Sequence, residues 1–166
     1  MAEFYGTVDG YRQYCFDRNT NNVNHPDDKI QAALVVASEW LDAEYRGSFP
    51  GLKVGLREQV REWPRTGAQD IYGYAISEAS VPVEVINATY EAAIRELTSS
   101  GSLSVDYTPA RYKRASVDGA VDVEYRHFDS PSEAQTRIMI VDQVLRPILT
   151  GRLGMVSNTV GQAVRG

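Results

Sequence analysis

Residues 26–45 read PDDKIQAALVVASEWLDAEY, and this stretch decides the fold. Its apolar side chains recur every three or four residues, which is the period of an amphipathic α-helix with one buried stripe. The stripe consists of Ile30, Leu34, Ala37, Leu41 and Tyr45. Pro26 suits a first helical turn, and Asp27 and Asp28 complement the positive end of the helix dipole. The sequence therefore predicts a helix over residues 26–45 that packs against other apolar elements.

Two more apolar stripes predict two more long helices. The helix at about residues 82–98 presents Val83, Ile86, Tyr90, Ala93 or Ile94, and Leu97. The helix at about residues 131–146 presents Ala134, Ile138, Val141, Leu145 and, just past its end, Ile148. Ser130 and Glu133 form a capping box at the start of this last helix, and Pro147 ends it by removing a backbone donor.

The remaining segments are shorter. Residues 8–17 and 56–63 fit short helices, and Pro64 ends the second of them. Asp118-Gly119 is a favoured two-residue turn inside an alternating pattern, which predicts a β-hairpin at about residues 111–126. Counting outward from this turn pairs Val117 with Ala120, Lys113 with Glu124, and Tyr112 with Tyr125.

These elements predict a mainly α fold. We expect a compact bundle of about three to five helices, one β-hairpin at about residues 111–126 and an extended C-terminal tail. Residues 1–149 form a single domain in this interpretation. Residues 150–166 form a flexible arm, because they contain four glycines, two arginines and no acidic residue.

Composition limits the classes of function. With 17 basic and 22 acidic residues, the chain has a formal charge of −5, which argues against the broad positive field of a sequence-independent nucleic-acid binder. The longest apolar run, residues 32–37, is far too short to span a membrane. Cys15 is the only cysteine, and its expected role is that of a small buried apolar group. His25 and His127 lack partners at metal-binding or catalytic spacing, so we expect no catalytic residue, no metal and no cofactor.

Two segments carry candidate binding residues. Residues 63–67, WPRTG, fit either a rigid loop pinned to the core by Trp63 or a subunit interface that includes Arg65. The hairpin concentrates positive charge beside tyrosines, and its candidate residues are Arg111, Tyr112, Lys113, Arg114 and Tyr125. Such a composition suits nucleic-acid backbones and bases, but neighbouring carboxylates cancel the charge. A ribbon for subunit contacts is therefore the favoured interpretation of the hairpin.

Five segments resemble one known family in the order in which they occur. They are residues 37–45 (ASEWLDAEY), 63–68 (WPRTGA), 81–82 (VP) with the alanine-rich 88–93, 121–125 (VDVEY) and 141–149 (VDQVLRPIL). Together they resemble the head-tail connector or adaptor proteins of tailed bacteriophages. That family includes proteins labelled as DnaT-like single-stranded-DNA-binding proteins.

The resemblance implies a structural virion protein with no enzymatic activity. Its subunits would form a dodecameric ring that docks on the portal protein, extends the DNA channel and joins head to tail. The implied partners are further copies of the chain, the portal, a downstream neck or tail-completion protein, and double-stranded DNA that passes without specific binding. No membrane is involved, and the implied location is the virion neck after assembly in the host cytoplasm.

The family's C-terminal segment reaches towards the portal, which makes the arm the expected docking element. Its candidate residues are Arg152, Leu153, Met155, Val156, Val160 and Arg165. The alternative function is a replication-associated single-stranded-DNA-binding protein, and a third is a small enzyme of unrecognised type. Strong binding of an oligonucleotide that weakens steeply with salt would favour the alternative.

Overall fold

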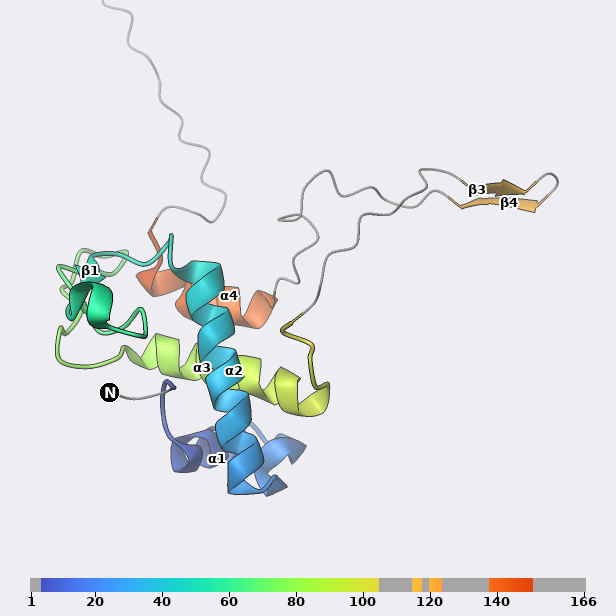
Figure 1. Cartoon of the computed structure of the whole chain (residues 1–166), viewed down its shortest axis with the longest axis horizontal. Helices are drawn as coiled ribbons and strands as arrows, with labels where there is room; N and C mark the ends of the chain where they lie inside the picture. Colours follow the sequence, from blue (N-terminus) through green and yellow to red (C-terminus); the bar gives the residue numbers. More distant parts are fainter. Residues whose placement is uncertain (1–3, 105–114, 118–119, 124–137, 151–166) are drawn as a thin grey trace, which may run out of the picture.

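The computed structural model describes residues 4–104, 115–117, 120–123 and 138–150 of the chain. Within these residues, four α-helices form the body: α1 (Val8–Asp17), α2 (Asp27–Tyr45), α3 (Val83–Thr98) and α4 (Met139–Leu145). The long helix α2 crosses α3, α4 packs against α3, and α1 lies near the start of α2 (Figure 1). The predicted mainly α fold is confirmed.

Short elements connect these helices. Strands β1 (Leu52–Lys53) and β2 (Arg65–Thr66) pair antiparallel, as do β3 (Ala115–Val117) and β4 (Ala120–Val123). Three 3₁₀ turns are η1 (Asn21–Asn24), η2 (Leu56–Glu58) and η3 (Arg146–Ile148). Among the described helices, none has the length and apolar character needed to cross a membrane.

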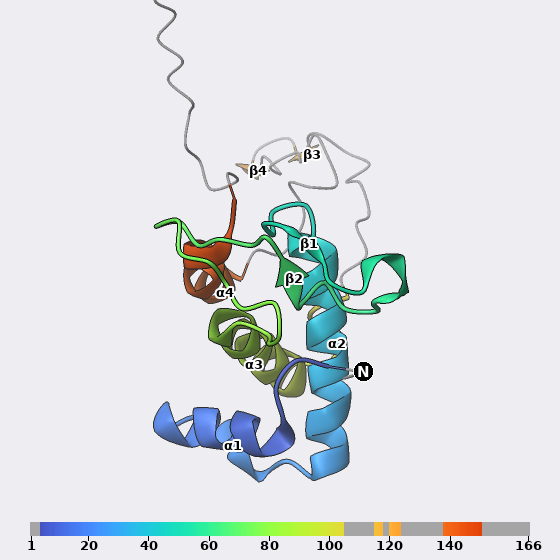
Figure 2. The same cartoon turned by 90° about the vertical axis from the view of Figure 1, so that its left-hand side faces the viewer.

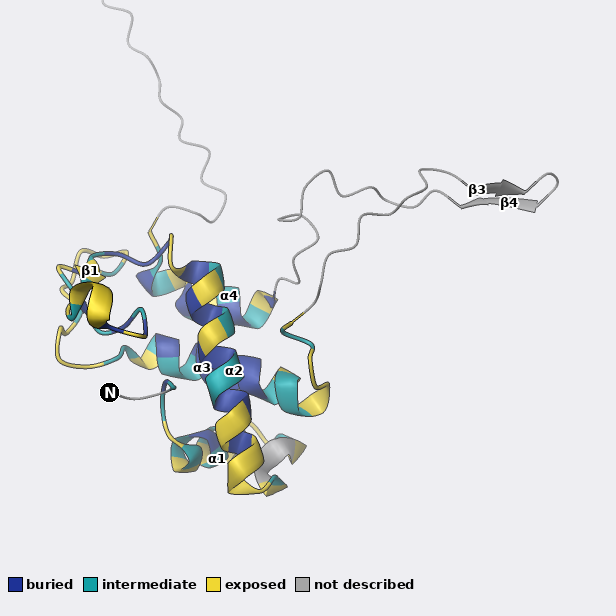
Figure 3. Cartoon of the chain, in the orientation of Figure 1, coloured by how far each residue is buried: buried dark blue, intermediate teal, exposed yellow. Residues whose placement is uncertain are grey.

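Helix α2 confirms the first prediction. All five residues of its predicted stripe are buried, and Asp27 and Asp28 occupy its first turn. Buried residues gather where α2 and α3 face each other, whereas exposed residues cover the outer side of α2 and the loop that carries β1 (Figure 3). The alternation of apolar and polar residues at helical period thus places α2 correctly against the core.

Helix α3 has the predicted position, but its buried face differs from the predicted stripe. Val83 is exposed, whereas Val85, Ala88 and Ala92 are fully buried. The reason is that α3 contacts α1, α2 and α4, so more than one side of the helix is covered. A single apolar stripe is typical of a surface helix that buries one face, whereas a central helix buries more than one face.

Helix α4 is shorter than predicted. It begins at Met139, because Ile138 has an extended backbone with φ −93° and ψ 94° that does not continue a helix. The capping-box residues Ser130 and Glu133 lie outside the described residues. The apolar pattern itself is confirmed for its described members, which are Ile138, Val141, Leu145 and Ile148. Pro147 ends α4 as predicted and lies in η3.

The predicted helix at residues 56–63 is wrong, since only the turn η2 forms there. The side chain of Gln59 explains the difference. Its Oε1 accepts a hydrogen bond from Gly55 N (2.8 Å), and its Nε2 donates to the carbonyls of Arg61 (2.9 Å) and Pro64 (3.0 Å). A polar side chain that bonds nearby backbone groups offers them an alternative to helical hydrogen bonds.

The β-hairpin is confirmed at its centre and shifted further out. Val117 pairs with Ala120 as predicted, but Ala115 pairs with Val123, with an irregularity in between. An extra residue on one strand produces such a shift, as in a β-bulge. The predicted pairs Lys113 with Glu124 and Tyr112 with Tyr125 lie outside the described residues.

Helix α1 is confirmed over its predicted residues, and Tyr90 of α3 contacts its N-terminal end. The hydroxyl of Tyr90 accepts a hydrogen bond from Thr7 N (3.0 Å). It also sits where side chains of Gly6 and Gly10 would be: a Cβ added at either glycine would lie 2.4 Å from Tyr90 Oη. Cys15 is fully buried in α1, as predicted.

Candidate nucleic-acid interface

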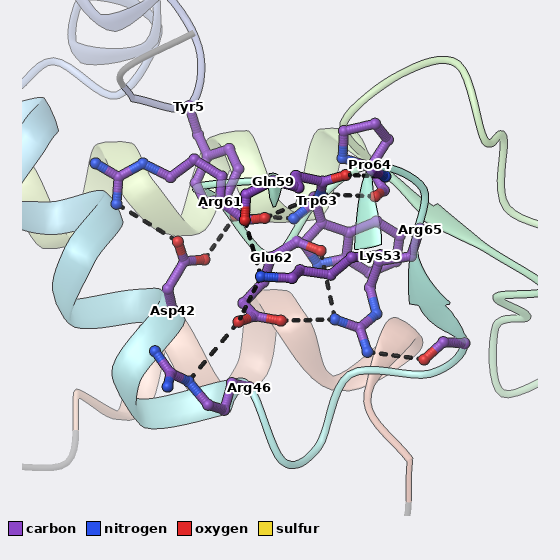
Figure 4. A network of polar contacts seen from close by, with 12 residues as sticks. Tyr5, Asp42, Arg46, Lys53, Gln59, Arg61, Glu62, Trp63, Pro64 and Arg65 are labelled. Atoms are coloured by element: carbon purple, nitrogen blue, oxygen red, sulfur yellow. Dashed lines mark hydrogen bonds and ion pairs between the residues drawn. The ribbon is translucent and has the colours of Figure 1, made fainter. Parts of the chain in front are cut away.

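The connection between α2 and α3 contains both segments that could serve as a site. Its first half, up to β2, is tied to α2 by a network of polar contacts (Figure 4). Its second half leaves the body and runs out beside α4 before α3 begins (Figure 2). The two halves differ in burial, and the difference decides which of them can meet a partner.

Trp63 anchors the first half to the core. Its side chain is only 2% exposed, and its ring packs edge-on against Phe49 with centroids 5.6 Å apart. The peptide bond between Trp63 and Pro64 is cis. Trp63 N donates to the hydroxyl of Tyr5 at 3.1 Å, so the N-terminal segment is fixed to the same point.

A buried carboxylate lies next to this anchor. Asp42, on α2, accepts a hydrogen bond from Tyr5 Oη through Oδ1 (2.6 Å) and faces Arg61 Nη1 through Oδ2 (3.4 Å). Burial raises the pKa of Asp42 above its ordinary value, and the hydrogen bond from Tyr5 and the charge of Arg61 oppose that shift. Burial also raises the pKa of Tyr5, with the charge of Asp42 acting in the same direction. The phenol therefore stays protonated and donates to the carboxylate.

A second carboxylate gathers cations from three elements. Glu62 Oε2 pairs with Arg65 Nη1 at 2.8 Å, and Glu62 Oε1 lies 3.7 Å from Arg46 Nε and 4.0 Å from Lys53 Nζ. The pair with Arg65 is within hydrogen-bonding distance, and the other two are longer ion pairs. This group joins the end of α2, β1 and β2 into one unit.

Arg65, a predicted interface residue, is 7% exposed. Its Nε donates to the carbonyl of Pro50 and its Nη2 to that of Gly51, both at 2.7 Å. Gly51 is required there, because its φ is +69° and an added Cβ would lie 2.3 Å from Thr66 O. The arrangement supports the rigid-loop interpretation of WPRTG. A role of Arg65 at a subunit interface stays a prediction.

The other predicted site residues cannot be placed. Those of the hairpin region, Arg111, Tyr112, Lys113, Arg114 and Tyr125, lie outside the described residues. The same holds for those of the arm, Arg152, Leu153, Met155, Val156, Val160 and Arg165. The last described residue is Thr150, whose N and Oγ1 donate to the carbonyl of Ser48 at 2.8 and 2.9 Å.

Sequence reasoning missed the most exposed aromatic pair of the connection. Tyr72 and Tyr74 are 76% and 72% exposed, and their ring centroids lie 6.5 Å apart with the planes tilted by 49°. Asp70 Oδ1 accepts hydrogen bonds from the backbone N of both tyrosines, each at 2.9 Å. The signal in the sequence was Asp70-Ile71-Tyr72-Gly73, because aspartate before a glycine is typical of a turn.

This tyrosine turn, residues 70–74, is attached to the body at its base. Ile71 N donates to the carbonyl of Pro147 at 2.9 Å, which ties the turn to η3. Arg146, the residue before Pro147, is exposed. Two exposed aromatic rings and an exposed guanidinium are thus carried by adjoining segments.

An apolar groove of about 640 Å³ opens on the body near the N-terminal segment. Its lining includes Phe4, Val54, Trp63, Pro64, Val81 and Ile86. Such a lining suits an apolar side chain and offers little to a phosphate. In the part of the chain that the structure describes, no group of three or more His, Cys, Asp or Glu side chains could hold a metal ion.

Comparison with known proteins identifies a ligand class for the family. No curated protein and no solved structure shows significant similarity to the chain. One family model, described as "Putative DnaT-like ssDNA binding protein", matches residues 1–166. This description contradicts the head-tail connector function and its virion keywords. It also contradicts the implied partners, namely a dodecameric ring on the portal, a neck protein and double-stranded DNA that passes unbound.

The connector function rests only on the resemblance of the five segments, and the net charge is a separate argument against a nucleic-acid ligand. That charge argument does not decide the ligand, because a net charge of −5 is a sum over residues and does not say where the charges lie. Because the match extends over residues 1–166, the chain belongs to the family of DnaT-like single-stranded-DNA-binding proteins.

Proposed function

We propose that this chain binds single-stranded DNA and that it does so without catalysing a reaction. The observation that carries the proposal is the family match over residues 1–166, whose description names this ligand. An association with DNA replication, part of the alternative function, stays a prediction. So does the expected location in the virion neck with assembly in the host cytoplasm.

The composition of the hairpin region supports the proposal. Residues 111–114 read RYKR, which places three cations around one tyrosine. Proteins that bind single strands combine cations for the phosphates with aromatic rings on which bases stack. The carboxylates of this region, which first favoured subunit contacts, reduce the phosphate attraction without affecting the stacking faces.

Ion pairs within the chain limit the electrostatic part of the affinity. A single strand releases counterions when cations neutralise its phosphates. The logarithm of the binding constant therefore falls with the logarithm of the salt concentration, with a slope of about −0.7 per phosphate contact. Arg61 and Arg65 are buried against Asp42 and Glu62, so these two cations are not available to a strand. We therefore expect base stacking to contribute a large part of the affinity.

The test is a titration of labelled oligothymidylate with the full chain, followed by fluorescence anisotropy at about 50 mM and 200 mM salt. The matched control is the same strand annealed to oligoadenylate, since a duplex hides its base faces. We expect the single strand to bind more tightly than the duplex at both salt concentrations. Absence of binding at the lower salt concentration, or equal affinity for the duplex, would overturn the proposal.

A further inference from the structure

We infer that Tyr72 and Tyr74 are base-stacking residues of the single-stranded-DNA site. The inference rests on the proposed function and assigns part of that function to the tyrosine turn. Both rings are more than two-thirds exposed, at 76% and 72%. Their tilt of 49° leaves the ring faces uncovered by each other.

The turn presents these rings in a fixed arrangement. Asp70 N donates to the carbonyl of Tyr74, and Gly73 N donates to that of Asp70, both at 3.0 Å. The Asp70 carboxylate adds its two hydrogen bonds to the tyrosine nitrogens. Gly73 has a φ of +85°, which closes the turn. A turn whose backbone is already bonded loses little conformational entropy when a ligand arrives.

The base of the turn is equally well fixed. Gln69 and Ala75 form an antiparallel bridge, and Ile76 N donates to the carbonyl of Ala68 at 2.9 Å. Ile71 N is bonded to the carbonyl of Pro147, so the turn cannot fold back onto the body without breaking this contact. The exposure of the rings therefore follows from the backbone structure.

The chemistry of the turn suits bases better than phosphates. The carboxylate of Asp70 is bonded to the backbone N of both tyrosines, and its charge disfavours a phosphate at the turn. Each base has a π-face, so two tyrosines can stack on a strand of any sequence. Arg146 is exposed in η3, the element that holds the turn, and offers a guanidinium for the backbone of the same strand.

The test compares four forms of the full chain in the oligothymidylate titration. They are the wild type, the double variant Tyr72→Ala/Tyr74→Ala, the double variant Tyr72→Phe/Tyr74→Phe, and Phe16→Ala. Phe16 is the matched control, since it is 73% exposed but lies on α1. Circular dichroism and urea unfolding establish that each form is folded, as expected for changes at exposed side chains.

We expect the alanine pair to raise Kd at least about tenfold, because each stacked ring contributes substantially to affinity. The phenylalanine pair, which keeps the rings, should stay within about threefold of the wild type, as should Phe16→Ala. A strand of abasic nucleotides should bind the wild type and the alanine pair with similar, weak affinity.

Two failures are distinguishable. If the wild type binds the oligonucleotide and the alanine pair binds it equally well, the tyrosines do not stack on bases, and the proposed function stands. If the wild type itself does not bind at low salt, the proposed function is overturned, and the assignment of the tyrosines with it.

Discussion

The Trp63 segment and the tyrosine turn lie within the same connection between α2 and α3, and their aromatic residues have opposite fates. Trp63 is 2% exposed, whereas Tyr72 is 76% exposed. Around Trp63, polar side chains reach across to α2 and its end: Arg61 faces Asp42, and Glu62 lies near Arg46. In the tyrosine turn, the Asp70 side chain bonds the backbone N of Tyr72 and Tyr74 within the same turn. The two rings remain exposed.

The comparison teaches that the partners of a loop's polar groups decide the exposure of its aromatic groups. Where the polar side chains bond to a helix, the loop is drawn onto the body and its aromatic residue becomes core. Where the polar side chain closes a local turn, the loop stands away from the body and its aromatic residues face outward. The first half of the connection thus contributes to the core, and the second half presents two exposed aromatic rings.

The largest effect should come from removing the anchor of the first half. Trp63→Ala should lower the free energy of unfolding by about 4 kcal/mol, because it removes a buried aromatic side chain and leaves a cavity. Urea unfolding monitored by circular dichroism measures the change. Trp63→Phe, which refills part of the space against Phe49, should cost clearly less. A loss below about 1 kcal/mol for the alanine variant would show that the segment is not fixed by this residue.

An intermediate effect should come from the phenol that joins the N-terminal segment to this region. Tyr5→Phe leaves Trp63 N and Asp42 Oδ1 without their shared partner, which should cost about 2 kcal/mol at neutral pH. The pKa of Tyr5 is raised in the folded state, so the stability it provides is present below about pH 10 and is lost as the pH rises further.

The difference in unfolding free energy between wild type and Tyr5→Phe should therefore shrink by roughly 1 kcal/mol between pH 8 and pH 10.5. Tyr11 and Tyr14 also have raised pKa values, but they are present in both proteins and cancel in the difference. A difference that grows with pH would contradict the assigned hydrogen bond. Urea unfolding at the two pH values measures it.

The smallest effect on stability should come from the tyrosine turn. Tyr72→Ala/Tyr74→Ala should change the free energy of unfolding by less than about 0.5 kcal/mol per residue, because both rings are exposed. Asp70→Ala, which removes the acceptor of two backbone hydrogen bonds in the same turn, serves as the contrast and should cost about 1 kcal/mol. A large loss in the tyrosine variant would mean that the rings stabilise the body, and the contrast between the two halves would disappear.

The parts of the fold that local pattern governs could be predicted from the sequence. The helix over residues 26–45 has a single covered side, so its stripe showed both its position and its orientation. The start of α4 could not be predicted in this way, because the apolar pattern runs on without a break where the backbone of Ile138 is extended. The width of the buried face of α3 depends on three neighbouring helices, which no local pattern reveals.

The candidate site was harder to predict from the sequence, for a physical reason. The chain contains ten tyrosines, and a tyrosine suits the core as well as the surface, because it combines an apolar ring with a hydroxyl. Tyr11 is fully buried and Tyr72 exposed, although each of them directly adjoins a glycine in the sequence. For WPRTG, the sequence could indicate a rigid loop. Only the structure shows that the Arg65 guanidinium donates to the carbonyls of Pro50 and Gly51 and pairs with the carboxylate of Glu62.

The contact of Tyr90 with the two glycines near α1 makes three positions depend on one another during evolution. Gly6 has a φ of +80° and is constrained by its own backbone as well as by the phenol. Gly10 is helical, so only the nearby hydroxyl forbids a larger residue there. A relative with alanine at position 10 is therefore expected to carry a smaller residue at position 90. Such paired exchanges across the family would show that the packing of α1 against α3 is retained.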